Sequence, residues 1–189
     1  EVQSNVINAD GSFVVTRATV LLINEERAIK EQAQTSLSYN RTLETLDVVE
    51  AFTQKPDGRK VPVKPEQIKE QQELASSQAP MFQDSRVKVV IFPEVAVGDR
   101  LVLQYKKNRM KALFPNQFED LSYPAFSPTR QFTLIYDLPE DMPLHAEAKG
   151  FTAVAQKAAA GRKVYRWDYV PADKARIEQG AVSYLDYGQ

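Results

Sequence analysis

Hydrophobic and polar residues alternate along most of this chain, and the alternating runs are separated by residues that favour turns. The segment 85–105 shows the pattern best. An alternating, β-branched run stops at Pro93, a turn follows at Gly98 and Asp99, and a second alternating run continues to Tyr105. A two-residue period is typical of half-buried strands, so this segment predicts a strand, a corner and a second strand.

Two hairpins are predicted in the first half of the chain. The first joins residues 2–7 to residues 13–23 through an Asp-Gly dipeptide, which tolerates the positive φ of tight turns. The second joins residues 43–54 to residues 60–63 through a Pro-Asp-Gly turn. These short turns favour antiparallel pairing, because parallel strands need longer connections.

The first half also contains two polar segments without strand periodicity. Residues 24–33 begin with Asn24 in an N-cap position, which predicts one or two helical turns or an irregular excursion. Residues 65–77 are the least strand-like part of the chain. A short helix that starts at Pro65 and a solvated loop are both compatible with their composition.

The second half combines further strands with a proline-containing loop. Residues 113–129 hold three prolines and predict a long structured loop. The remaining strand candidates are residues 131–138, 145–154 and 163–170. About ten strands with short turns and no sustained helical period predict an all-β fold, an antiparallel sandwich or barrel.

Length and composition narrow the possible functions. A chain of 189 residues predicts one domain, residues 1–189, in which residues 175–189 are a linker or an edge strand. The net charge is −1 and no Lys/Arg cluster stands out, so we expect no nucleic-acid partner. No apolar run approaches the roughly 20 residues that cross a bilayer. The chain opens without a basic and apolar leader, which fits either a protein without an export signal or a processed form.

The residues that carry chemistry are few. With no cysteine, the chain has no disulfide and no thiol nucleophile. His145 is the only imidazole and reads as a surface or strand-edge residue. The paired carboxylates lie beside turns or prolines, where solvated acids are common, and the glycines sit singly. We therefore expect no catalytic residue, no cofactor and no metal site, and do not expect an enzyme.

Six motifs occur in a fixed order along the chain. They are NADGS at 8–12, YNRTLETL at 39–46, KPDGR at 55–59, APMFQDSR at 79–86, FPEVAVGDRL at 92–101 and LFPNQF at 113–118. With these motifs the chain resembles, over roughly residues 2–169, the DUF3857 family, domains of unknown function found upstream of transglutaminase-like cysteine-hydrolase domains in exported bacterial proteins. The resemblance implies an immunoglobulin-like β-sandwich, a periplasmic or cell-surface location and a downstream partner domain in the same polypeptide.

A candidate interaction surface lies in the loop 113–129, which is richer in aromatic residues than a solvated loop needs. The loop either caps the end of the β fold or exposes an apolar patch that docks a neighbouring domain, a peptide or a glycan. The candidate contact residues are Arg109, Phe114, Phe118, Tyr123 and Phe126. The leading hypothesis is a non-catalytic accessory domain that supports or positions the downstream domain. The alternative is an autonomous binding module for an envelope glycan or peptide.

Overall fold

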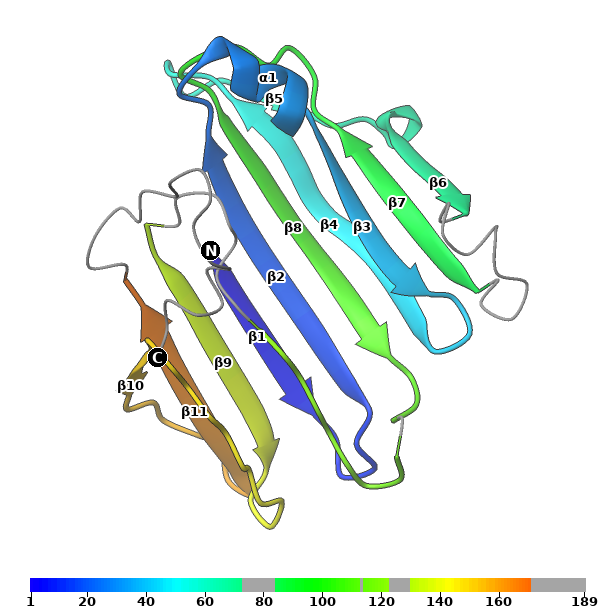
Figure 1. Ribbon diagram of the computed structural model, residues 1–189, viewed down its shortest axis with the longest axis vertical. Coiled ribbons are helices and arrows are strands. Elements are labelled where there is room, and N and C mark those ends of the chain that lie inside the picture. The colour runs from blue at the N-terminus through cyan, green and yellow to red at the C-terminus, as the bar shows by residue number, and fades with distance from the viewer. Residues whose placement is uncertain (73–83, 113, 123–129, 171–189) are drawn as a thin grey trace, which may run out of the picture.

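The computed structural model describes residues 1–72, 84–112, 114–122 and 130–170. These residues form a mostly β structure with one α-helix and one 3-10 helix (Figure 1). The helices are α1 (Glu26–Gln32) and η1 (Pro65–Gln67). The strands are β1 (Val2–Ile7), β2 (Phe13–Leu22), β3 (Gln34–Asn40), β4 (Glu44–Gln54), β5 (Lys60–Pro62), β6 (Ile68–Gln72), β7 (Ser85–Ile91), β8 (Arg100–Arg109), β9 (Phe132–Pro139), β10 (Thr152–Val154) and β11 (Arg162–Tyr169).

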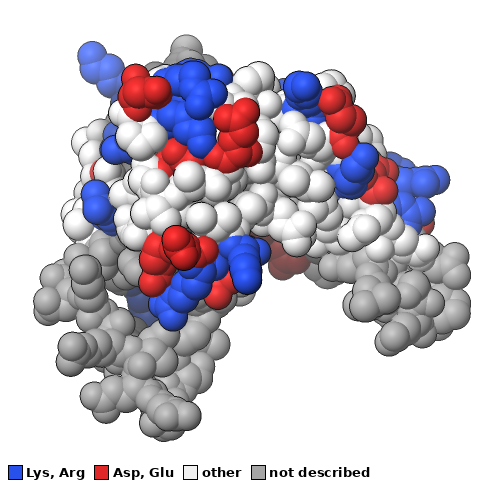
Figure 2. Space-filling view, turned by 90° about the horizontal axis from the view of Figure 1, so that it is seen from above, with Lys and Arg blue, Asp and Glu red and all other residues white. Residues whose placement is uncertain are grey.

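The described strands form two sheets. The larger sheet has eight strands in the order β10-β11-β9-β1-β2-β8-β4-β5, and the smaller has three in the order β3-β7-β6. In space, β3 lies next to β4, so the small sheet lies beside the large sheet on the side of β4 (Figure 1). Seen from the α1 end, the described part of the molecule forms an arch (Figure 2). The predicted all-β class is confirmed at this level. The immunoglobulin-like sandwich stays a prediction.

The prediction of purely antiparallel pairing is wrong for one pair of strands. β1 and β9 run parallel, with Val2 opposite Thr133 and Val6 opposite Asp137. No tight turn joins these two strands, because residues 8–131, about two thirds of the chain, lie between them, so turn geometry does not set their direction. The large sheet is therefore mixed.

β8 sets the register of its two neighbours in the large sheet, β2 and β4. It pairs along its whole length with β2, from Arg100 opposite Leu22 to Arg109 opposite Phe13. On its other side it pairs with β4, where the register shifts between Val48 and Glu50. The extra residue is a β-bulge, which reverses the inward and outward positions of the strand beyond it.

Two separate apolar clusters cover one face of the large sheet, which we call the inner face. In the first cluster, Leu37 and Val90 of the small sheet pack against Leu46, Leu101 and Leu103 of β4 and β8. Partly buried residues of α1 also pack against this cluster. The second cluster is built on β1 and β9, and its buried members are Ile7, Phe132, Leu134, Tyr136 and Leu138.

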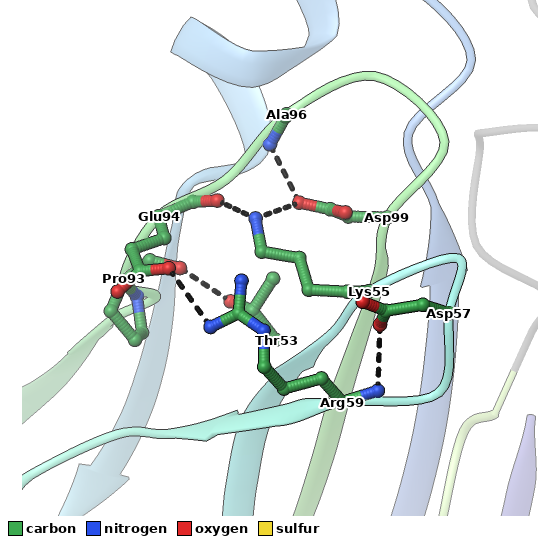
Figure 3. A network of polar contacts seen from close by, with 8 residues as sticks. All are labelled: Thr53, Lys55, Asp57, Arg59, Pro93, Glu94, Ala96 and Asp99. Atoms are coloured by element: carbon green, nitrogen blue, oxygen red, sulfur yellow. Dashed lines mark hydrogen bonds and ion pairs between the residues drawn. The ribbon is translucent and has the colours of Figure 1, made fainter.

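A buried ion pair fixes the corner between the two sheets (Figure 3). Lys55 Nζ lies 2.8 Å from Asp99 Oδ2, and the side chain of Asp99 is 1% exposed. The same carboxylate oxygen accepts a hydrogen bond from the Ala96 amide at 2.7 Å, and the Thr53 hydroxyl donates to the Pro93 carbonyl at 2.7 Å. These bonds tie the segment between β7 and β8 to the end of β4.

Local sequence signals located most elements. Both hairpins are confirmed, and β7, the corner and β8 occur as expected. The helix after residue 24 is also confirmed as α1, but its N-cap is Glu25 rather than Asn24 and makes no side-chain cap bond. The short helix at Pro65 is present as η1.

Three strand assignments were missed or wrong. The strands β3 and β6 were not predicted. β6 has no buried residue and is held by pairing with β7, whereas β3 does alternate over a short stretch that buries Leu37 and Tyr39 in the first cluster. Of the predicted strand 145–154, only Thr152–Val154 is a strand. Met142, Leu144 and Phe151 instead pack against the second cluster, so this segment covers the cluster and does not extend the sheet edge.

No helix in the described part of the chain is long and apolar enough to cross a membrane. On the end that carries α1, Figure 2 shows acidic and basic side chains interleaved rather than gathered by sign.

The Lys55–Asp99 pair generates a stability prediction. The substitution Asp99→Asn leaves the largely buried Lys55 ammonium without its counter-charge, so we expect a loss of about 3 kcal/mol in the free energy of unfolding. The matched control is Arg59→Gln, which removes an exposed pair with Glu94 at 3.4 Å in the same network and is expected to cost less than about 1 kcal/mol. Urea denaturation measures both, and equal losses would contradict the role given to Asp99.

Candidate functional site

A strip of polar side chains separates the two apolar clusters on the inner face. The registers place Gln3 of β1 opposite Arg17 of β2, and Arg17 opposite Tyr105 of β8. The next inner positions of β8 are Lys107 and Arg109, and Arg109 lies opposite Glu44 of β4. Apolar residues thus give way to charged ones in the middle of a continuous sheet.

This strip is the floor of a groove with a volume of about 540 Å³. Its floor comes from strands β1, β2, β4 and β8, and its rim from the segment 119–122. The lining residues are Gln3, Phe13, Val15, Arg17, Glu44, Tyr105, Lys107, Arg109, Glu119, Asp120, Leu121 and Ser122. Ligand sites commonly have volumes of about 300 to 1,000 Å³, so the groove is large enough for a small ligand or a few residues of a peptide.

At the β4 end of the floor, the buried carboxylate of Glu44 forms ion pairs with two cations. Glu44 Oε1 lies 3.1 Å from Arg109 Nε in an ion pair without hydrogen-bond geometry, and 3.9 Å from Lys107 Nζ. Glu44 Oε2 accepts a hydrogen bond from the Asn40 amide at 2.9 Å. Since the Lys107 ammonium is beyond hydrogen-bond distance from Glu44, it keeps donors for another acceptor.

Arg17 organises the opposite end of the floor. Its guanidinium pairs with the Glu1 carboxylate and lies 5.9 Å from the centroid of the Phe132 ring. Burial raises the pKa of the neighbouring Tyr105 phenol, although the Arg17 charge acts in the opposite direction. Tyr105 therefore presents a neutral hydroxyl to the groove at physiological pH.

The rim is tied to the second cluster by hydrogen bonds. Asp120 Oδ2 accepts from the Tyr136 hydroxyl and from the Ser122 hydroxyl, both at 2.6 Å. Gln3 Nε2 donates to Ser122 Oγ at 2.9 Å. Burial, followed by the bond to Asp120, raises the pKa of Tyr136 well above its usual range. The rim therefore has defined polar anchors although it contains no secondary structure.

Aromatic contacts anchor the neighbouring part of the same loop. Phe118 packs edge-on against Phe13, with ring centroids 4.9 Å apart, and against Tyr136 at 5.9 Å. The loop backbone also lies so close to Gly11 that a Cβ there would be 2.3 Å from the Gln117 carbonyl oxygen. Residues 114–122, which we call the rim loop, thus fold back onto the turn between β1 and β2.

The structure brings three of the predicted contact residues together. Arg109, Phe114 and Phe118 line one small cavity of about 40 Å³ beside the Gly11 turn. Phe118 is a packing residue, whereas Phe114 is 58% exposed. Tyr123 and Phe126 lie outside the described residues.

Sequence reasoning missed most of the groove. The predicted strand ended at Tyr105, whereas β8 continues to Arg109, so that Tyr105, Lys107 and Arg109 occupy alternate positions of one strand and share a face. Only Arg109 was selected, because the partners of the strand, Glu44 and Arg17, were unknown. His145 is exposed, as predicted, but it is not part of a strand. Among the described residues no group of three or more His, Asp or Glu side chains could hold a metal ion.

The comparison with family models decides the family. The model of a domain of unknown function with a solved structure (DUF3857) matches residues 9–173. The chain belongs to the DUF3857 family. This finding confirms the resemblance in the sequence motifs, and it assigns no activity. No curated protein matches the chain.

A solved structure shares the fold of this DUF3857 chain. It is a crystal structure at 2.00 Å resolution described as a "putative protease" from Parabacteroides distasonis, with a TM-score of 0.76 and 19% sequence identity. The match covers 93% of this chain and 35% of that one, so this chain spans about a third of the length of its structural relative. At this identity the likeness shows the fold alone.

The rim loop generates a prediction with a matched control. Gly11 and Gly58 both have positive φ, of 82° and 90°, but only Gly11 faces a close neighbour. Gly58→Ala should cost about 1 kcal/mol of unfolding free energy through backbone strain alone. Gly11→Ala should cost about 2 to 4 kcal/mol, because the new methyl group displaces Gln117, and should make the rim loop easier to cleave. Equal losses, with an unchanged rate of proteolysis, would contradict the close packing.

The raised pKa of Tyr136 generates a prediction about alkaline pH. An unfolded phenol ionises near pH 10, whereas the folded one stays neutral, so the contribution of Tyr136 to the free energy of unfolding is constant below about pH 10 and falls above it. Tyr136→Phe should flatten this fall, as measured by denaturant titrations between about pH 8 and pH 11. The fall should persist in part, because burial also raises the pKa of Tyr39 and of Tyr105. If the free energy of unfolding fell with pH as steeply in the variant as in the unsubstituted chain, the raised pKa of Tyr136 would be refuted.

Proposed function

We propose that this DUF3857 chain is a non-catalytic accessory domain that supports and positions a transglutaminase-like domain of the same polypeptide. The observation that carries the proposal is an anchored loop with an outward apolar surface. Phe114 is 58% exposed, while Phe118 and Asp120 hold the rim loop to the second cluster. A large exposed apolar side chain on a fixed backbone suits a contact with another domain.

The structural relative supports a role inside a longer polypeptide. There the same fold takes up 35% of a chain described as a putative protease. In the proposal, the catalytic residues belong to the partner domain, and this domain contributes a rigid β surface on which the partner rests. We also propose that the pair works in the periplasm or at the bacterial cell surface, a location that the family resemblance supports.

The alternative is an autonomous module that binds an envelope glycan or peptide. The observation that favours it is the groove, which is large, polar and open beside the rim loop. The two functions differ in what the rim loop contacts. In the accessory domain the outward side of the loop contacts the neighbour, whereas in the binding module the groove side of the loop contacts the ligand.

The accessory role is tested in the full-length polypeptide by calorimetry. We expect this domain and the transglutaminase-like domain to unfold in one cooperative transition, and Phe114→Ser to split that transition in two. The control is Val49→Ser, which changes an equally exposed residue on β4, also 58% accessible. Phe118→Ala is unsuitable, since Phe118 packs against Phe13 and Tyr136.

Two separate transitions in the unsubstituted polypeptide would reject the accessory role, as would equal effects of Phe114→Ser and Val49→Ser. Limited proteolysis gives an independent readout. In the docked pair the rim loop is protected, and in the Phe114→Ser variant it is cleaved faster. Ligand retention is not expected to change with this variant.

A further inference from the structure

The floor of the groove carries more positive than negative charge. The floor strands contribute the cations Arg17, Lys107 and Arg109 and the carboxylate Glu44, whereas the other two lining carboxylates, Glu119 and Asp120, belong to the rim. Arg17 is neutralised by Glu1, but Glu44 is shared between Lys107 and Arg109. The β4 end of the floor therefore has one positive charge in excess, at side chains that are 29% and 19% exposed.

The polar groups of β8 repeat with the spacing of an extended chain. Tyr105, Lys107 and Arg109 are at alternate positions of one strand and face the same side. Alternate residues of a strand lie about 6.8 Å apart, which is also the spacing of alternate side chains in an extended peptide. A peptide that runs along β8 can therefore place one acidic side chain over Lys107 and another over Arg109.

The rim offers acceptors rather than further cations. Glu119 and Asp120 line the groove opposite the floor, together with Ser122. Carboxylate and hydroxyl oxygens accept hydrogen bonds from peptide N–H groups. The same carboxylates repel a ligand with a charge on every unit, such as a phosphodiester chain, so the mixed lining favours a chain that is acidic only at alternate positions.

We propose that the groove binds an extended peptide segment with acidic side chains at alternate positions, which pair with Lys107 and Arg109. The backbone of this segment donates hydrogen bonds to the rim. The site is distinct from the exposed Phe114 surface of the proposed function and needs no neighbouring domain. The segment belongs to a separate protein, since the groove lies open beside the rim loop in this domain.

The test uses the 189-residue chain and a blocked five-residue peptide of alternating glutamate and alanine. In ¹⁵N correlation spectra the peptide should shift the amide signals of β8 and of the rim loop. A peptide of alternating lysine and alanine should not bind. A peptide with its three glutamates adjacent should bind more weakly, because only alternate side chains of an extended chain face the same way.

The variants compare two neighbouring lysines on opposite faces of β8. Lys107→Gln should weaken binding of the acidic peptide about three- to ten-fold, because it removes a charge-assisted contact. Lys106→Gln should change it less than about two-fold, since the exposed Lys106 points away from the groove. Thermal unfolding of both variants establishes that the fold is retained.

Several outcomes would overturn the proposal. They are shifts that map outside the groove, equal effects of the two lysine variants, equal binding of the lysine peptide, and no binding of the acidic peptide. Tighter binding of a short single-stranded oligonucleotide at the same residues would show that the ligand is a phosphate chain and not a peptide. To test whether the segment belongs to a separate protein, the longer polypeptide is titrated with the same peptide. Loss of binding there indicates that a segment of the partner domain already occupies the groove, whereas retained binding indicates a separate protein.

Discussion

The ion pair between Lys55 and Asp99 fixes the point where the chain passes from the small sheet to the large one. β7 ends at Ile91 and β8 begins at Arg100, and between them the buried Asp99 carboxylate holds both Lys55 and the Ala96 amide. β8 then sets the registers of β2 and β4. A slip of one residue at this corner would turn every side chain of β8 to the opposite face, removing Leu101 and Leu103 from the first cluster.

The bulge in β4 lets one strand serve both the corner and the groove. Glu44 and Thr53 both face inward, although residues 45–52 between them are even in number, and in a regular strand they would lie on opposite faces. The extra residue at Val49 corrects this, so that Thr53 reaches the Pro93 carbonyl while Glu44 reaches Arg109. The buried carboxylate of Glu44 is thus a consequence of the same irregularity that allows the corner to close.

Local patterns predicted what is local. Alternation and Asp-Gly turns located the hairpins, since partners joined by a tight turn need no further information. The parallel pairing of β1 with β9 could not be predicted from the sequence, because nothing in either strand identifies the other as its partner. β6 was missed for a related reason, as its polar residues are ordered by the edge of β7.

The candidate site shows the same division. The change along β8 from Leu101 and Leu103 to Lys107 and Arg109 is readable in the sequence as one face that turns from apolar to charged. The sequence does not reveal that Glu44 meets Arg109, or that the rim loop closes the other side. These contacts join segments that are far apart along the chain, so they follow from topology and not from periodicity.

The rim loop connects the two proposed contacts. Phe114 presents apolar surface to a neighbour, whereas Asp120, Leu121 and Ser122 line the groove. All belong to one short segment that is anchored by Phe118. A ligand that draws Asp120 away from Tyr136 would also shift the surface on which a neighbour rests, and a neighbour that holds the loop would fix the rim for the ligand. Because such coupling is reciprocal, the sign of one effect determines the sign of the other. If both proposed contacts exist, the position of an attached domain depends on the peptide in the groove.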